Sequence, residues 1–125
     1  MKIYRSKKDG VTVWRLIGVV QKADAAGLVR AMKGTAKRLR GCHVLDFTDV
    51  VHVDYHAFRT LEDRIPADAG IVLSGLSDYV LDIFAFAQQK RHLVIYSDWR
   101  EALQYIRFDR GKILAPASHD FAGFK

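Results

Sequence analysis

The sequence predicts a single α/β domain built on a mixed β-sheet of about five strands with about four helices. Short apolar runs alternate along the chain with longer segments whose apolar residues recur every three or four positions. Near the N-terminus, two strand-like segments flank an Asp-Gly pair, which favours a hairpin. A length of 125 residues with only two prolines is enough for one hydrophobic core but not for two.

Composition narrows the class of protein. The formal net charge is +6, which could suit an acidic partner, a nucleic acid or a membrane surface. No apolar run is long enough to span a bilayer, and the N-terminus lacks the apolar stretch of a signal peptide, so we expect a cytoplasmic protein. The single cysteine, Cys42, excludes an intramolecular disulfide and a cysteine-based metal cluster, and it fits a reducing compartment.

The N-terminal part of the chain predicts a hairpin followed by a basic helix. Strands are expected at 2–6 and 11–17 around Asp9-Gly10, and a helix at 22–40 that ends at Gly41. The basic residues of this helix face away from its apolar stripe, which consists of Leu28, Met32, Ala36 and Leu39. They are Lys22, Arg30, Lys33, Lys37, Arg38 and Arg40. No aromatic residue lies among them, so a solvated face is favoured over nucleic-acid binding.

The centre of the chain predicts a buried strand that leads into a helix. The run 43–47 is apolar and delivers Asp46 and its neighbours to one edge of the sheet. A short loop at 48–52 is expected next. Asp54 then stands where an N-cap carboxylate would accept the first amide hydrogens of a helix. The buried face of that helix is indicated by helical spacing of Phe58, Leu61 and Ile65.

The rest of the chain continues the alternation. We expect a strand at 71–73, a helix at 78–87 capped by Ser77, a strand at 92–96 and a last helix capped by Ser97 or Asp98. This gives a domain over residues 1–107. The segment 108–125 has no clear period and is expected to be a C-terminal tail, packed back on the domain or partly disordered.

The usual signatures of catalysis are missing. None of the five histidines belongs to a helical metal-binding pair, and the sequence has no glycine-rich phosphate loop, nucleophile elbow or Cys/His dyad. Asp46, Asp49 and Asp54 could hold a divalent cation. However, helix capping by Asp54 and hydrogen bonding of Asp49 to loop amides explain these residues better. The sequence therefore predicts no enzyme, no catalytic residue, no metal site and no cofactor.

One stretch resembles a known family. Leu45-Asp46-Phe47-Thr48-Asp49-Val50, a short spacer and then Val53-Asp54-Tyr55-His56-Ala57-Phe58 resemble the signature segment of STAS domains. These domains occur in anti-sigma factor antagonists, in anion transporters and in bacterial stress-signalling and lipid-transport complexes. The order of expected elements agrees with the STAS topology across residues 1 to about 107. The resemblance implies a single STAS-like domain.

The chain departs from the family pattern at the switch position. The family motif reads Asp-Ser-Ser-Gly; Asp54 matches its aspartate, Tyr55 and His56 fall on the two serines, and Ala57 falls on the glycine. In the antagonists the second serine accepts the phosphoryl group that controls partner binding. The resemblance implies that this switch is absent here, because histidine replaces that serine. Whether His56 or any other residue is phosphorylated stays open.

Two classes of function remain. In the first, the domain is a non-catalytic regulatory protein–protein interaction module whose partner, by the resemblance, is an anti-sigma kinase or a subunit of a transporter or stress complex. In the second, the same edge binds a small anion or nucleotide through helix-terminal amides, or serves as an accessory part of a transporter. The contact surface expected for the first class comprises Thr48, Asp49, Asp54, Tyr55, His56 and Arg59.

Overall fold

The computed structural model describes residues 1–36, 43–67, 69–90 and 92–112. Its strands are β1 (Lys2–Lys8), β2 (Val11–Val20), β3 (His43–Val53), β4 (Ile71–Ser74) and β5 (Val94–Tyr96). Its helices are α1 (Lys22–Ala36), α2 (Tyr55–Arg64), α3 (Asp78–Ala87) and α4 (Trp99–Lys112). The predicted α/β class with a five-stranded mixed sheet is confirmed.

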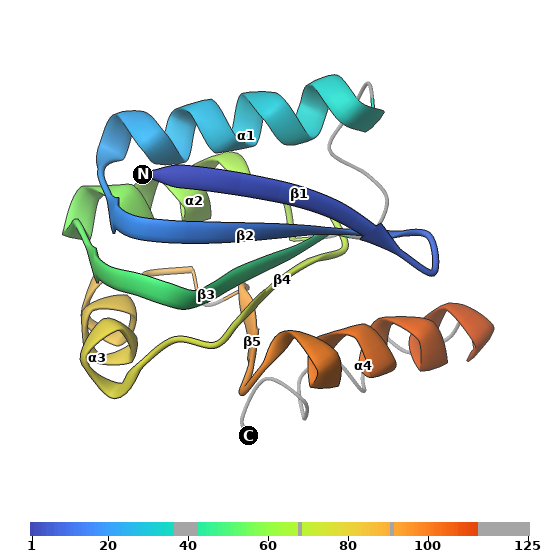
Figure 1. Ribbon diagram of the computed structural model, residues 1–125. Helices are drawn as coiled ribbons and strands as arrows, with labels where there is room; N and C mark the ends of the chain where they lie inside the picture. Colours follow the sequence, from blue (N-terminus) through green and yellow to red (C-terminus); the bar gives the residue numbers. More distant parts are fainter. Residues whose placement is uncertain (37–42, 68, 91, 113–125) are drawn as a thin grey trace.

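The strands follow one another across the sheet in chain order (Figure 1). The β1–β2 hairpin is antiparallel and lies at one edge, while β2 to β5 are parallel to one another. Its turn contains Asp9 at φ 55° and Gly10 at φ 80°, which are conformations that Asp-Gly pairs adopt readily. Parallel neighbours need a crossover connection, which explains why a helical segment separates each of these strands from the next in the sequence.

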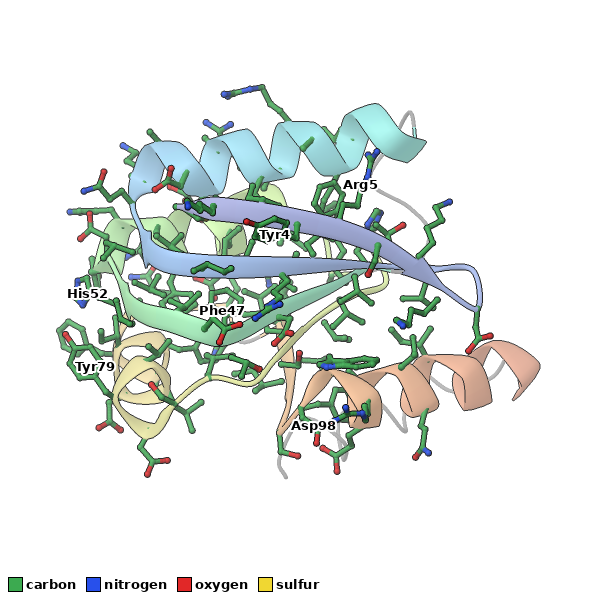
Figure 2. The ribbon with its side chains drawn as sticks, in the orientation of Figure 1. Tyr4, Arg5, Phe47, His52, Tyr79 and Asp98 are labelled. Atoms are coloured by element: carbon green, nitrogen blue, oxygen red, sulfur yellow. The ribbon has the colours of Figure 1, made fainter. Side chains whose placement is uncertain are left out.

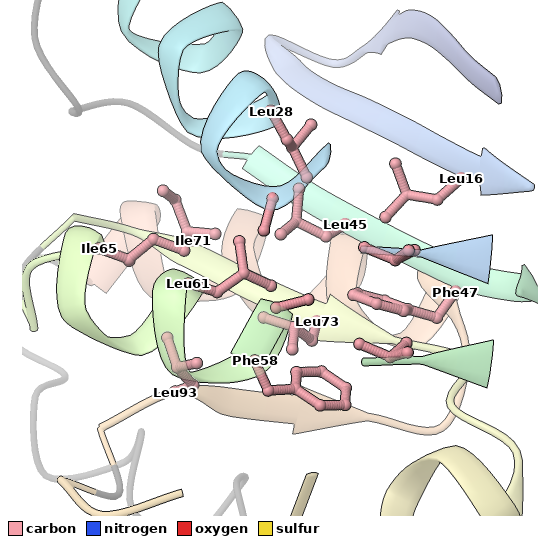
Figure 3. Packing of buried hydrophobic residues seen from close by; sticks show 14 of the residues in the cluster. Leu16, Leu28, Leu45, Phe47, Phe58, Leu61, Ile65, Ile71, Leu73 and Leu93 are labelled. Carbon is pink, nitrogen blue, oxygen red and sulfur yellow. The ribbon is translucent and has the colours of Figure 1, made fainter. Parts of the chain in front are cut away.

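Both faces of the sheet carry a hydrophobic core. On one face, α1, α2 and α3 cover side chains such as Leu16, Phe47 and Leu73, which pack against Leu28 and Phe58 (Figure 3). On the other face, α4 is the one helix among the described residues (Figure 1). Its residues Ala102, Leu103 and Ile106 cover a smaller set of β-branched side chains, which comprises Val11, Val13, Val44 and Val72. The alternation of side chains along β2 to β5 supplies both cores, whereas the residues of β1 are exposed.

Two predicted helix caps are present. Ser77 Oγ accepts a hydrogen bond from Val80 N at 3.2 Å, and Asp98 Oδ1 accepts one from Glu101 N at 2.8 Å. Each satisfies an amide of the first turn that has no partner within its own helix. The start of α3 and the start of α4 were therefore readable from local chemistry.

The loop predicted at 48–52 is wrong, because β3 continues without interruption to Val53. The strand stays paired with β2 far beyond the end of β4 at Ser74, with Asp49 opposite Ile17 and His52 opposite Val19. Irregularities in the register accompany this extension. A long partner strand offers backbone hydrogen bonds to polar residues whose composition alone suggests a loop.

Some predicted features differ in extent or lie outside the described residues. The last helix reaches Lys112, so the first residues assigned to the tail are helical, and the division at 107 stays a prediction. Cys42, the helix end at Gly41 and the positions 37–40 and 113–125 lie outside the described residues. Within the described part of the chain, none of the helices combines the length and apolarity that crossing a bilayer requires.

A buried carboxylate joins α2 to the segment that follows α3. Glu62 is only 2% exposed, and its oxygens accept hydrogen bonds from the backbone amides of Gln89 at 2.9 and 3.0 Å and Lys90 at 2.5 Å. The next residue, Asp63, makes only a long, exposed ion pair of 3.6 Å with Lys90 Nζ. The two neighbouring acids thus differ sharply in what they hold.

We therefore predict that Glu62→Ala lowers the free energy of unfolding by about 2–3 kcal/mol, because it leaves buried amides without an acceptor. Glu62→Gln, which keeps one carbonyl oxygen, should cost less. Asp63→Ala, the matched control, should change stability by less than about 0.5 kcal/mol. Urea unfolding followed by circular dichroism measures all three. An equal effect of Glu62→Ala and Asp63→Ala would contradict a stabilising role for the hydrogen bonds that Glu62 accepts.

Candidate functional site

The candidate site begins where β3 passes directly into α2. Asp54 N donates a hydrogen bond to Val20 O at 2.8 Å, which extends the β2–β3 pairing to the residue before the helix. Asp54 has the backbone conformation of an N-cap, but the predicted side-chain cap is wrong, because its carboxylate accepts no cap hydrogen bond. The amides of Ala57 and Phe58 instead bond to the Asp54 carbonyl. The sheet, rather than a capping carboxylate, sets where α2 starts.

The first turn of α2 presents two rings to the surface. His56 is exposed and Tyr55 is half-buried, and their rings are nearly perpendicular with a centroid distance of 5.2 Å. The Tyr55 ring also lies 5.5 Å from the ring of Phe86, which belongs to α3. Phe86 is 80% exposed. Three aromatic side chains from two helices therefore adjoin one another. We call the group of Tyr55, His56 and Phe86 the corner.

Arg59 holds this corner together. Its Nη1 donates to the Tyr55 hydroxyl at 3.0 Å, and its Nη2 donates to Gln89 Oε1 at 2.9 Å. The guanidinium carbon also lies 5.8 Å from the centre of the Tyr55 ring. A planar cation with several donors suits such a double contact. Arg59 was predicted as a contact residue, and the structure shows it half-buried and engaged in positioning Tyr55.

A row of residues along α3 extends the corner. Tyr79, Ile83 and Phe86 have the spacing of one helical face, and Tyr79 is 55% exposed. At the far end of the row, the Tyr79 hydroxyl lies 2.7 Å from His52 Nδ1 on β3 (Figure 2). We define the aromatic band by the following residues: His52, Tyr55, His56, Tyr79, Ile83 and Phe86.

The α3 members of this band were missed in the sequence. The helix reads Asp-Tyr-Val-Leu-Asp-Ile-Phe-Ala-Phe-Ala, and only Val80, Phe84 and Ala87 are buried against the core. A helix that covers a core with one face needs a single apolar stripe. The second stripe, through Tyr79 and Phe86, was the available signal.

Thr48 and Asp49 lie apart from the corner, on the other face of the sheet. Asp49 Oδ2 pairs with Arg15 at 2.6 Å, and Arg15 alternates with the buried side chains Trp14 and Leu16 of β2. The predicted bonding of Asp49 to loop amides is therefore wrong, since it pairs with a neighbouring strand. The predicted contact surface therefore divides into two groups. The α2 group comprises Asp54, Tyr55, His56 and Arg59, and the sheet-face group comprises Thr48 and Asp49.

The sheet-face group is organised by a buried aspartate. Asp46 Oδ1 accepts hydrogen bonds from the Thr48 amide at 3.0 Å and from the Thr48 hydroxyl at 2.6 Å. Asp46, Asp49 and Asp54 thus have separate surroundings. Among the residues that the structure describes, no three His, Cys, Asp or Glu side chains are arranged to hold a metal ion.

Comparisons with protein-family models and with curated proteins found no match. Solved structures do match in fold. An RsbS variant from Moorella thermoacetica is 14% identical over 86% of this chain and 97% of its own, with a TM-score of 0.65. An anti-sigma factor antagonist from Mycobacterium paratuberculosis is 14% identical over 85% and 93%, with a TM-score of 0.66. The chain has an α/β STAS-like fold.

The same fold occurs inside a larger protein. The murine anion transporter Slc26a9 is 14% identical over 82% of this chain, which corresponds to 18% of the transporter, with a TM-score of 0.62. At such identities the likeness concerns the fold, and the similar proteins include both antagonists and a transporter segment. The correspondence of His56 to the antagonists' serine stays a prediction from the sequence.

Gly75 controls the surroundings of Thr48. It adopts φ +73°, and a Cβ added to it would collide with the Thr48 hydroxyl and lie 3.1 Å from Asp46 Oδ1. Gly27, within α1, has an ordinary conformation, and a Cβ added there would meet only the end of the Arg30 side chain, 3.7 Å away. The two glycines therefore form a matched pair.

We predict that Gly75→Ala lowers the free energy of unfolding by at least about 2 kcal/mol, because a left-handed alanine is strained and displaces Thr48. Gly27→Ala should leave stability unchanged or raise it by up to about 1 kcal/mol, since alanine favours a helix. Thermal and urea unfolding measure both variants. Equal stability of the two would contradict the close packing of Gly75 on Thr48.

Proposed function

We propose that this protein is a non-catalytic regulatory module that binds a protein partner through the exposed start of α2. The observation that carries the proposal is the group of Tyr55, His56 and Phe86, in which one ring is braced and two rings are exposed. Aromatic side chains held in this way anchor protein interfaces at a small entropic cost. Asp54 and Arg59 belong to the same proposed contact surface.

The structural neighbours support the regulatory part of the proposal. Several of them are described as anti-sigma factor antagonists, a name that describes action on another protein. By this analogy the partner is an anti-sigma kinase, and a subunit of a transporter or stress complex is the alternative. The partner-binding role extends to Thr48 and Asp49 only for a partner large enough to reach the other sheet face.

We also propose that binding is not controlled by a serine phospho-switch. In the sequence, His56 falls on the expected acceptor position, and the hydroxyls of Thr48, Thr60 and Ser77 are poorly placed to replace a serine. Thr60 is buried, the Thr48 hydroxyl donates to Asp46, and Ser77 caps α3. Phosphorylation at any of them would first have to break an existing contact or open the core.

The structure offers less to the alternative of an anion or nucleotide site. Asp54 places a carboxylate beside the first turn of α2, where a phosphate would have to approach the amides. The Asp54 carboxylate and a phosphate bound at these amides would both be negatively charged and would repel each other. Protein binding is therefore the better-supported function of this corner.

The first test replaces His56 with a photo-crosslinking amino acid and exposes the protein to native lysate. Position 56 should yield a discrete adduct with one protein, because it lies on the proposed contact surface. The same residue at Arg30, exposed on α1, is the control and should yield none. With the identified partner purified, Arg59→Ala should weaken binding by about tenfold, since Tyr55 loses its brace.

Two outcomes would contradict the module proposal. One is the absence of a light-dependent adduct specific to position 56. The other is a large rise in the melting temperature with ATP, GTP or inorganic phosphate and no protein partner, which would favour the anion or nucleotide site.

The second test concerns phosphorylation. We predict that the protein isolated from its own cells at neutral pH, which preserves phosphohistidine, has the unmodified mass, because no acceptor serine occupies position 56. His56→Ser, isolated in parallel, restores the family's acceptor and shows whether a kinase recognises the site. Intact mass spectrometry with fragmentation decides between them. A phosphoryl group on His56 of the unsubstituted protein would overturn the absence of a switch.

A further inference from the structure

The helix α3 carries more apolar surface than its packing uses. Within the described residues, the exposed large hydrophobic side chains include Tyr79 and Phe86 of this one short helix, which are seven positions apart and therefore share one helical face. Scattered exposed apolar residues are ordinary, but a contiguous group marks an interaction surface. Tyr79 and Phe86 both belong to the aromatic band, where their rings adjoin those of His52 and Tyr55.

The band is preorganised rather than loose. Phe86 packs against Tyr55, and Tyr55 is hydrogen-bonded by Arg59. At the other end, Tyr79 is hydrogen-bonded to His52, and their ring centres are 5.7 Å apart. Tyr55 and Ile83 also pack on the main core. Rings held in their bound positions before binding lose little freedom when a partner docks.

The charges around the band are acidic. Asp82 stands between Tyr79 and Phe86 on the same face of α3, and Asp78 is exposed in its first turn. Within the described residues, neither aspartate belongs to an ion pair. Among the described residues, Arg59 contacts Tyr55 and Lys90 lies 3.6 Å from Asp63, and neither forms an ion pair with Asp78 or Asp82. A protein of net charge +6 thus presents two aspartates, which we call the acidic rim, on the helix that carries the exposed rings of Tyr79 and Phe86.

This charge decides which occupant the surface fits. A second copy docking through the same face would bring two sets of Asp78 and Asp82 together, and like charges across an interface are costly. Phosphate-rich surfaces, such as nucleic acids or anionic lipids, are repelled for the same reason. An apolar segment that carries Lys or Arg meets both the rings and the rim.

We infer that the aromatic band is the docking site for an apolar, basic segment of a partner protein, with Phe86 as the central anchor and Asp82 as the main charge contact. This inference rests on the proposed function and adds the chemistry of the partner and the extension of the site to α3. The partner segment places an apolar side chain against Phe86 and Tyr55, and a Lys or Arg beside Asp82.

The test uses a phage-displayed random peptide library selected on the full chain. Enriched peptides should combine aromatic or aliphatic residues with Lys or Arg. By fluorescence polarisation, Phe86→Ser should weaken their binding by about tenfold and Asp82→Lys by about fivefold, and added salt should weaken binding to the unsubstituted protein. Tyr4→Ser, which removes an exposed ring from the edge strand β1, is the matched control and should bind unchanged.

Phe86 is mostly exposed, so its replacement should leave the thermal unfolding curve unchanged, which checks that lost binding is not lost folding. The inference is overturned if no peptide is enriched, if enriched peptides are acidic or uncharged, or if Phe86→Ser binds them normally. A partner captured at position 56 that binds Phe86→Ser normally overturns the inference and leaves the proposed function standing. Peptides of the expected chemistry that require Phe86, without a partner captured at position 56, would support the band as a binding surface and contradict the proposed contact at the start of α2.

Discussion

The extended pairing of β2 with β3 is the constraint on which the candidate site depends. The two strands stay hydrogen-bonded past the end of β4, and the last bond joins Asp54 N to Val20 O. Since α2 begins at the next residue, this bond fixes the position and direction of the helix start. Tyr55 and His56 are therefore mounted on the sheet itself rather than on a loop, and a rigid base favours selective binding.

A second set of contacts joins α2 to α3 and makes one platform of them. Glu62 accepts from the backbone after α3, and Arg59 reaches Gln89 in the same segment while it holds Tyr55. One side of α2 thus holds the segment that follows α3, and the start of the same helix presents rings to solvent. Exposure of apolar rings to water is unfavourable in free energy, and a group of such rings held in place is typical of an interaction surface.

Much of the fold could be predicted because its causes are local. Ser77 and Asp98 each lie a few residues before an amide that needs an acceptor, so both caps were readable. Asp54, like Asp98, is an aspartate directly before a helix. Its side chain makes no cap hydrogen bond, because the pairing of β2 with β3 already determines where α2 starts. The loop expected at 48–52 failed for the same reason, since a partner strand distant in sequence makes it extended.

The sequence by itself determined the alternation of strands and helices and the buried face of α2, and it indicated the start of α2 as the candidate site, because periodicity and turn chemistry act over a few residues. Only the tertiary structure decided that Thr48 and Asp49 face away from that site, that Arg59 braces Tyr55, and that Phe86 joins it from α3. Those relations depend on which distant segments become neighbours, and that is settled when the sheet and helices pack together.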